Sequence, residues 1–450
     1  MIEIENLRLL REYIKSLGIK TECYIEMNST SRIRIRNQKI EDISNAYITG
    51  VQIRFYSKGK KIKRVFSSFL DIQKFFGEIM AEEQFWGEYE KETEYDQQEK
   101  VSSKYLPAEN FDEIIEKLLR INNELRFIHE VKTTILSYGK SDKTIFFLDS
   151  KGKIFVQTKR DIIANFAATI VNHNQIITYP ISLGSAINSN FLDDFKELII
   201  KPIKRMIQVP VTETISASKY TVILEPLVSG ILIHEVLGHL LEADTFFENQ
   251  NLLRELKLGT KIASSGLTVI DDPTVEGLRG SYYFDDEGVE SKKTILVENG
   301  YLKSYLHSKD SAKVMNAKLT GNARALNYRF FPIIRMSNIF VKEGDMPFIE
   351  MIRKMKNGLF IRGLKGANVN LKKFTIVPLE AYVVNDGKII GRCPDIYLKG
   401  EIDILKNIIY IGSESFTVQG YSCNKYAQRG LPVSVTAPYM CIERCDIEKL

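Results

Sequence analysis

The sequence predicts an α+β fold: N-terminal α/β-layered domains, followed by a strand-rich C-terminal domain that carries one prominent helix. Polar and apolar residues alternate at 32–36 (RIRIR), which is the period-two pattern of a half-buried strand. Two N-terminal stretches have the order helix, strand, strand, helix, which favours α+β layers over a doubly wound parallel sheet. Further along, Asn299-Gly300 and Asp386-Gly387 stand between apolar runs, and such dipeptides favour tight hairpin turns.

The elements follow in order along the chain. An amphipathic helix opens the first segment, and a polar, charged stretch separates it from the next one. We expect four segments: an N-terminal α+β domain (1–95), a polar linker (96–110), a central α+β domain (111–216) and a C-terminal β-rich domain (217–450). Within them, further helices are predicted over 71–91, from residue 111, over 190–206 and over 230–244.

Composition and charge exclude several classes of protein. The net charge of +5 over 450 residues is mild, and the basic runs KGKKIKR (58–64) and KPIKR (201–205) are typical of solvated surface, so no nucleic-acid partner is expected. The longest apolar neighbourhood is broken by Glu225 and Pro226, which excludes an ordinary membrane span. Neither signal peptide nor disulfide framework is recognisable, and the odd count of five cysteines favours a reduced, cytoplasmic protein.

The stretch ILIHEVLGHLLEAD (231–244) carries two histidines and a glutamate in an apolar helix. An α-helical projection places its apolar side chains in one buried stripe and puts His234, Glu235 and His239 on the opposite side. The two imidazoles then lie about 140° apart around the axis. Gly238 projects between them, where the lack of a side chain would admit a metal ion, and Ser229 is the expected N-cap.

This pattern has two interpretations. The histidines can be hydrogen-bonded structural residues of a core helix, or they can be two ligands of a metal ion beside a general base, Glu235. A catalytic zinc normally has three protein ligands, and His173, His307 and the cysteines are the remaining choices for the third. A second His-Glu pair, at His129, has no further histidine at four or five residues and is typical of helix surface.

The stretch HEVLGHLLEAD resembles the HExxxH signature of the TldD branch of the TldD/PmbA metalloprotease family. Further blocks resemble the family in the same order: 280–312, 319–345, 358–370 and SCNKYAQRGLPVSVTAP at 422–438. The resemblance implies a zinc site formed by His234, His239 and Cys423, with Glu235 as the catalytic residue. This sequence departs from the family's usual pattern at Asn424 and Ala323, and neither departure removes a ligand.

The resemblance therefore implies a zinc metalloprotease that hydrolyses unfolded or extended peptides. It also implies a dimer, either a homodimer or a heterodimer with a PmbA/TldE-type subunit. The alternative is a non-catalytic peptide-binding or scaffold subunit of such a dimer. Glu242 and Asp244 are candidates to orient the ligand histidines, because such imidazoles usually donate their second N–H to a carboxylate or carbonyl. Arg324 is a candidate to bind a substrate carbonyl or terminus.

Overall fold

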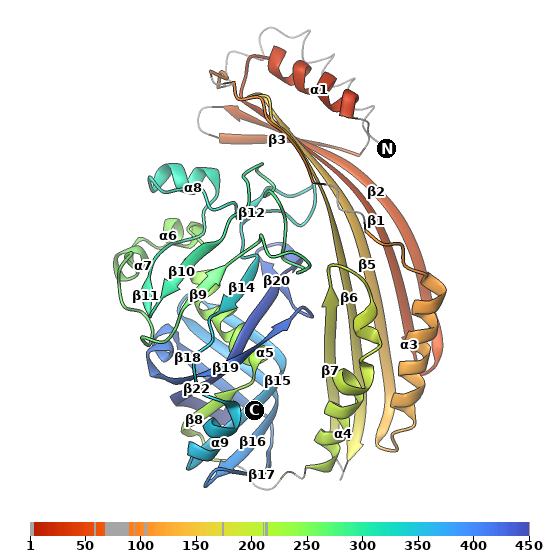
Figure 1. Ribbon diagram of the computed structural model, residues 1–450, viewed down its shortest axis with the longest axis vertical. Coiled ribbons are helices and arrows are strands. Elements are labelled where there is room, and N and C mark those ends of the chain that lie inside the picture. The colour runs from red at the N-terminus through yellow and green to blue at the C-terminus, as the bar shows by residue number, and fades with distance from the viewer. Residues whose placement is uncertain are drawn as a thin grey trace.

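The α+β prediction is confirmed by the computed structural model, in which two large sheets lie side by side (Figure 1). The structure describes residues 4–57, 60–67, 90–93, 95–102, 106–172, 175–209, 211 and 215–449. The helix predicted over 71–91 therefore falls, up to residue 89, outside the described residues. No helix in the described ranges is long and apolar enough to cross a membrane.

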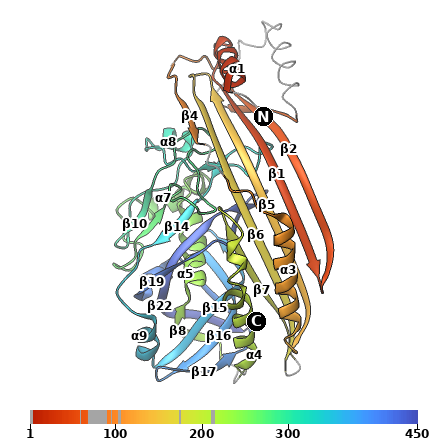
Figure 2. The same cartoon turned by 45° about the vertical axis from the view of Figure 1, so that its right-hand side comes forward.

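The first sheet has seven strands. Six follow the order β3-β2-β1-β5-β6-β4, and β7 pairs with residues 162–172 of β6, beyond the part that pairs with β4. Its longest strands form a tall curved wall beside the C-terminal part of the chain (Figure 2). The strands are β1 (Thr21–Arg36), β2 (Lys39–Ser57), β3 (Lys60–Phe66), β4 (Glu99–Ser102), β5 (Val131–Asp149), β6 (Ile154–Asn172) and β7 (Gln175–Ser185).

Amphipathic helices cover this wall. Helix α1 (Ile4–Ser16) buries Leu7 and Ile14 among apolar residues of β1, β2 and β5. Helix α3 (Phe111–Arg126) buries Leu118 and Leu125 in a second cluster, and the side chain of Asn110 caps its first turn. The helix predicted over 190–206 is a 3₁₀ turn (Asn190–Leu192), a π turn (Lys196–Ile200) and α4 (Lys201–Gln208).

The predicted segments 1–95 and 111–216 contribute to the same sheet. Strand β1 pairs with β2 on one side and with β5 on the other. The polar stretch predicted as a linker at 96–110 holds β4, which pairs in parallel with β6. The period-two pattern locates strands but does not say which strands pair, so the division at 96–110 does not separate two sheets.

The second sheet has eleven strands and begins near the predicted boundary at residue 217. The pairing runs β11-β10-β9-β14-β22-β18-β16-β15-β8, and β8 also pairs with β22, so part of the sheet closes on itself. The strands are β8 (Ser218–Leu224), β9 (Val269–Asp271), β10 (Thr294–Glu298), β11 (Tyr301–Leu302), β14 (Asn338–Val341), β15 (Asn357–Asn370), β16 (Lys373–Asn385), β17 (Lys388–Cys393), β18 (Ile396–Glu401), β19 (Ile408–Val418) and β22 (Ser434–Lys449).

Both predicted hairpin turns are present in this sheet. Asn299 and Gly300 have positive φ and join β10 to β11, and Asp386 and Gly387 do the same between β16 and β17. Short elements complete the domain: α6 (Asp244–Glu248), α7 (Gln250–Glu255), α8 (Lys309–Val314), α9 (Phe348–Lys354), a 3₁₀ helix (Ile402–Asn407), and the small pairs β12 (Ala323–Arg324) with β13 (Ile333–Ile334) and β20 (Ser422–Lys425) with β21 (Gln428–Pro432).

Helix α5 (Pro226–Ile233) lies in the core of the second domain. Val228, Ile231 and Leu232 are buried in the largest apolar cluster, against residues of β8, β15 and β22. Its N-cap is Glu225, whose side chain makes no capping hydrogen bond, so the prediction of Ser229 as N-cap is wrong. Proline at the first helical position fixes the helix start four residues earlier.

Buried polar contacts join the two sheets. The side-chain amide of Gln52, on β2, donates to the carbonyl oxygen of Tyr328 at 2.7 Å. Arg54, also on β2, pairs with Glu22 at 2.9 Å and donates to the carbonyl oxygen of Asp286 at 2.7 Å. Because these buried groups bond to backbone oxygens across the junction, they fix the N-terminal wall against the second domain.

Candidate metal centre

The helix that carries the two histidines changes its winding at the first of them. After α5 the chain forms a π-helical turn, η4 (His234–Gly238), and then a 3₁₀ turn, η5 (His239–Leu241). The backbone N–H of His239 donates to the carbonyl oxygen of His234, five residues earlier. The extra residue in this turn brings residues five apart onto one side of the helix, so the α-helical projection of about 140° is wrong.

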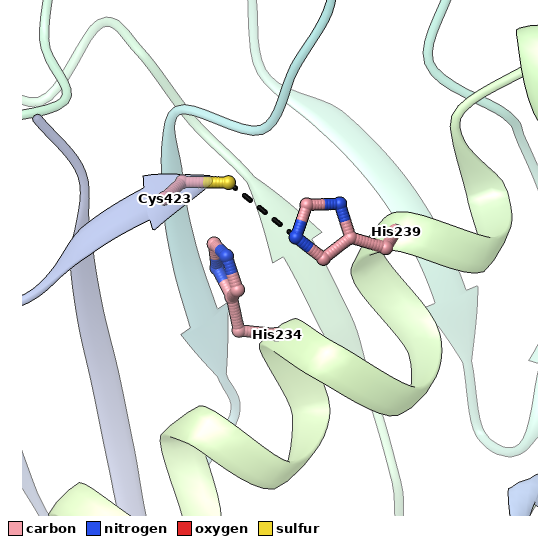
Figure 3. A group of neighbouring side chains, drawn as sticks. All are labelled: His234, His239 and Cys423. Atoms are coloured by element: carbon pink, nitrogen blue, oxygen red, sulfur yellow. Dashed lines mark hydrogen bonds between the residues drawn. The ribbon is translucent and has the colours of Figure 1, made fainter. Parts of the chain in front are cut away.

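His234, His239 and Cys423 come together at this turn (Figure 3). Their candidate ligand atoms all lie within 4.8 Å of one another. The two imidazole rings are 5.1 Å apart and nearly perpendicular, and Cys423 Sγ lies 3.4 Å from His239 Nε2. Cys423 belongs to β20, which pairs with β21 and brings a thiol from the far end of the chain to the helix.

The donor set fits a metal ion. His234 is fully buried, and neither ring nitrogen has a hydrogen-bond partner in the described part of the chain. Burying an imidazole in this state costs free energy unless a ligand binds it. Two imidazoles and one thiolate are preferred ligands of zinc, and three protein ligands leave one position open for chemistry.

Electrostatics favour the ligand form of Cys423. Burial alone would raise the pKa of the thiol, but the imidazoles of His239 and His234 outweigh it and hold the pKa well below its ordinary value. The thiolate is the form of cysteine that binds metals. The other four cysteines (Cys23, Cys393, Cys441 and Cys445) are buried and unpaired, and burial raises the pKa of each.

A carboxylate and a lysine hold the second ligand from behind. Glu242 Oε2 lies 3.1 Å from His239 Nδ1 and 2.8 Å from Lys425 Nζ. Burial would raise the pKa of Glu242, but Lys425 and His239 lower it to about 2, so the carboxylate is charged. Asp244 does not reach an imidazole; its two oxygens accept from Lys425 Nζ at 2.8 and 2.7 Å. Glu242 therefore has the orienting contact predicted for it, whereas Asp244 anchors the lysine.

Glu235 lies beside the cluster, in the wall of a cavity of about 370 Å³ that His239 also lines. One of its oxygens, Oε1, accepts a hydrogen bond of 2.7 Å from the hydroxyl of Tyr421. Burial raises the pKa of Tyr421, and the carboxylate of Glu235 raises it further, so the tyrosine keeps its proton. A carboxylate that opens onto a cavity next to three candidate ligands can exchange a proton with a molecule bound there.

Gly238 does not open a path for a metal ion. A Cβ built on Gly238 would lie 1.9 Å from Met336 Sδ, so the space beside this glycine is filled by the methionine side chain. The glycine is needed for close packing of the π turn against the segment after β13. The prediction that its missing side chain admits the metal is wrong.

The other candidates lie elsewhere. His307 is buried, with its Nδ1 3.1 Å from Ser311 Oγ, and does not belong to the cluster. His173 lies outside the described residues, and His129 is exposed. Arg324 is buried and donates to the carbonyl oxygens of Met336 and Pro432, which makes it a structural cross-link.

Sequence reasoning missed Tyr421 and Lys425, which flank Cys423 at two residues on either side. Both contact the carboxylates of the histidine helix, Tyr421 at Glu235 and Lys425 at Glu242. Neither lies in a helical or alternating pattern that sets it apart. The only signal was proximity in sequence to a cysteine that was itself found by resemblance.

Comparison with known proteins identifies the family. Residues 217–449 match the PmbA/TldA metallopeptidase C-terminal domain, and residues 21–81 match domain 1 of the same metallopeptidases. A metalloprotease of Methanocaldococcus jannaschii is 30% identical over 95% of this chain and 96% of its own length. A metalloprotease of Methanothermobacter thermautotrophicus is 33% identical over 70% of each chain.

Solved structures share the fold over the whole length. TldE from Thermococcus kodakarensis superimposes with a TM-score of 0.75 at 17% identity, covering 99% of both chains. A protein from Bacteroides thetaiotaomicron superimposes with a TM-score of 0.78 at 19% identity, covering both chains completely. The matched domains and the full-length relative together show that this chain belongs to the PmbA/TldD family of metallopeptidases.

Proposed function

We propose that this chain is a zinc-dependent peptidase of the TldD branch, which hydrolyses unfolded or extended peptides. The observation that carries the proposal is the convergence of His234, His239 and Cys423 beside Glu235, at the edge of a cavity. The resemblance to the TldD branch, which is distinguished from the PmbA branch by the histidine motif, supports the proposal, because this chain carries both histidines and the cysteine.

In this proposal His234 and His239 bind zinc as neutral imidazoles and Cys423 as a thiolate, with Glu242 orienting His239. Zinc held by these residues would supply Lewis-acid chemistry, polarising a substrate carbonyl and acidifying a water molecule. Glu235 is placed to accept a proton from a water molecule in the cavity and to donate it to the leaving amine, as general base and then general acid. The buried walls around His234 and Cys423 exclude bulk water and strengthen these interactions.

The cavity suggests how an extended peptide is held. Ala367, Asn368 and Val369 of β15 line it together with Glu235 and His239. Strand β15 pairs with β16 along its length but with β8 only at 359–361, and no described strand pairs with the remainder of that second edge. An unpaired edge can add an extended peptide as a further strand through backbone hydrogen bonds, which are largely independent of sequence.

The test compares the purified wild-type protein with Glu235→Gln and with Glu248→Gln, a variant of an exposed carboxylate in the same cavity wall. We expect one zinc per chain in all three. Hydrolysis of a denatured fluorogenic peptide library should fall by about 10²- to 10⁴-fold in Glu235→Gln alone. A wild-type protein that binds peptides but does not bind zinc and does not cleave the peptides would favour the alternative, a non-catalytic scaffold subunit.

The proposal extends to assembly and location. The family resemblance implies a homodimer or a heterodimer with a PmbA/TldE-type subunit, and light scattering of the protein alone and mixed with such a subunit separates the two. A reducing, cytoplasmic setting is supported by the five unpaired cysteines. It also suits a thiolate ligand, which oxidation would remove.

A further inference from the structure

Tyr421 contacts two members of the candidate centre without belonging to it. Its hydroxyl donates to Glu235 Oε1 at 2.7 Å, and its ring packs edge-on against the His234 imidazole at 5.4 Å. No group in the described residues forms a hydrogen bond with the other oxygen of Glu235, Oε2. The tyrosine therefore fixes one oxygen of the carboxylate and leaves the second one without a hydrogen bond among these residues, in a side chain that lines the cavity.

The backbone of Tyr421 is held by groups that have no part in the metal cluster. Arg279 Nη1 donates to the carbonyl oxygen of Tyr421 at 2.8 Å and to that of Gln419 at 2.5 Å. The same guanidinium is buried and bonded to Asp161 of β6 at 2.5 Å. This arginine therefore ties the tyrosine segment to the N-terminal wall of the molecule.

A close backbone approach fixes the same segment from the other side. A Cβ on Gly420 would lie 1.8 Å from the carbonyl oxygen of Ser182, and a Cβ on Gly184 would lie 2.5 Å from the carbonyl oxygen of Gln419. Only glycines allow the segment before β20 to pack this tightly against β7. The position of the Tyr421 hydroxyl is thus set in advance by packing between the two domains, independently of zinc.

We propose that Tyr421 is a positioning residue for hydrolysis, whose hydroxyl holds Glu235 in the orientation in which Oε2 faces the attacking water. This inference rests on the proposed peptidase function and adds a residue to it. A carboxylate on a flexible side chain must otherwise be ordered at each turnover, and misplacement by about 1 Å can cost 10²-fold in rate. The hydrogen bond removes that cost before substrate binds.

The first experiment replaces Tyr421 by Phe, which keeps the ring against His234 and removes only the hydroxyl. Its matched control is Tyr283→Phe, because Tyr283 donates the same kind of hydrogen bond, 3.3 Å, to the carboxylate of Glu276 at an exposed site outside this cavity. We expect kcat of Tyr421→Phe to fall by roughly 10- to 100-fold with KM and zinc content unchanged, since the lost interaction assists only the transition state. Tyr283→Phe should keep the wild-type kcat.

A second background tests whether Tyr421 acts through Glu235. Glu235→Asp keeps a carboxylate but withdraws it from the tyrosine hydroxyl by one methylene. Adding Tyr421→Phe to Glu235→Asp should then change kcat by less than about twofold, because residues that act as a unit are not additive. If the two substitutions instead lower kcat independently, so that their fold-changes multiply in the double variant, Tyr421 contacts the substrate itself and the proposal is overturned.

Two further results would also overturn it. One is loss of zinc from Tyr421→Phe, which would make the hydroxyl a support of the metal site. The other is a crystal structure of zinc-loaded Tyr421→Phe in which Glu235 keeps its position. If wild type cleaves peptides and Glu235→Gln does not, the peptidase function stands even when Tyr421→Phe is fully active. A wild type that cleaves nothing overturns both proposals.

Discussion

The backbone N–H of His239 bonds to the carbonyl oxygen of His234 within one π turn, so the two imidazoles project from the same side of the helix. Short π segments inside α-helices occur frequently at functional sites. Here the π turn accounts for the spacing of the motif. A gap of five residues presents both rings to one point, as a gap of four does on an α-helix.

We predict that Gly238→Ala destabilises the protein. The new methyl group would overlap Met336 Sδ, and overpacking of a buried site costs about 1–3 kcal/mol of unfolding free energy. Urea denaturation measures this cost, and zinc titration shows whether the π turn is displaced. Gly266→Ala, at an exposed site with its nearest neighbour 3.5 Å away, should be neutral. Equal stability of the Gly238 variant and wild type would contradict the packing argument.

Replacing Cys423 by Ser should weaken zinc binding by at least about 100-fold, because a serine hydroxyl does not deprotonate to a good zinc ligand. Competition with a chromophoric chelator measures the affinity. The corresponding change at Cys393, which is also buried but bonds to the carbonyl oxygen of Ala381, should leave zinc affinity intact. If both variants bind zinc like wild type, Cys423 is not a ligand.

The carboxylate behind His239 can be tested separately. Glu242→Gln keeps the size of the side chain but removes the charge that faces the imidazole and Lys425. Loss of such an outer partner typically lowers metal affinity by about 10- to 100-fold, and we expect that range here. Glu255→Gln, at an exposed site paired with Lys372, serves as the reference. An unchanged zinc affinity would show that His239 is oriented by other contacts.

The buried imidazole of His307 makes the stability of the folded protein depend on pH. Burial lowers its pKa to about 4, below the ordinary 6.5, so the folded protein keeps the imidazole neutral. The unfolded chain takes up the proton first, and stability is therefore complete above pH 6.5 and falls as the pH drops toward 4. We expect His307 to contribute up to about 3 kcal/mol of this fall.

The pH prediction is checked by denaturation of wild type and His307→Gln at pH 4–7. The variant should lose stability less steeply with acid than wild type does. His129→Gln, which removes an exposed imidazole, should follow the wild-type curve. Parallel curves for wild type and the His307 variant would exclude the buried histidine as the source of the slope.

Much of this organisation could be predicted from local patterns. The β-rich C-terminal domain, the two hairpin turns and helices such as α3 follow from periodicity and turn residues within a few positions of one another. The pair His234 and His239, with Glu235 between them, could also be recognised as a candidate site. Cys423 was assigned by resemblance to a family, because nothing in the surrounding sequence marks it out among five cysteines.

The wrong predictions concern helix winding and contacts between residues far apart in the sequence, which local patterns do not contain. An α-helical wheel assumes uniform winding, so it misplaced the rings, and it gave Gly238 an open space that Met336, 98 residues later, fills. The Tyr421–Glu235 contact and the pairing of β1 with β5 likewise join segments about 100 residues or more apart. Such contacts are set by tertiary packing, which one sequence does not reveal.

The order of the ligand residues along the chain also determines when the candidate metal centre can form during protein synthesis. His234 and His239 emerge first, but Cys423 follows 184 residues after His239, and β22, which packs against α5 in the core, follows Cys423. A nascent polypeptide still on the ribosome therefore holds two imidazoles without their thiolate. The candidate metal centre is therefore completed only after the segment around residue 423 has been synthesised, so the proposed peptidase stays inactive while the preceding segments are still emerging.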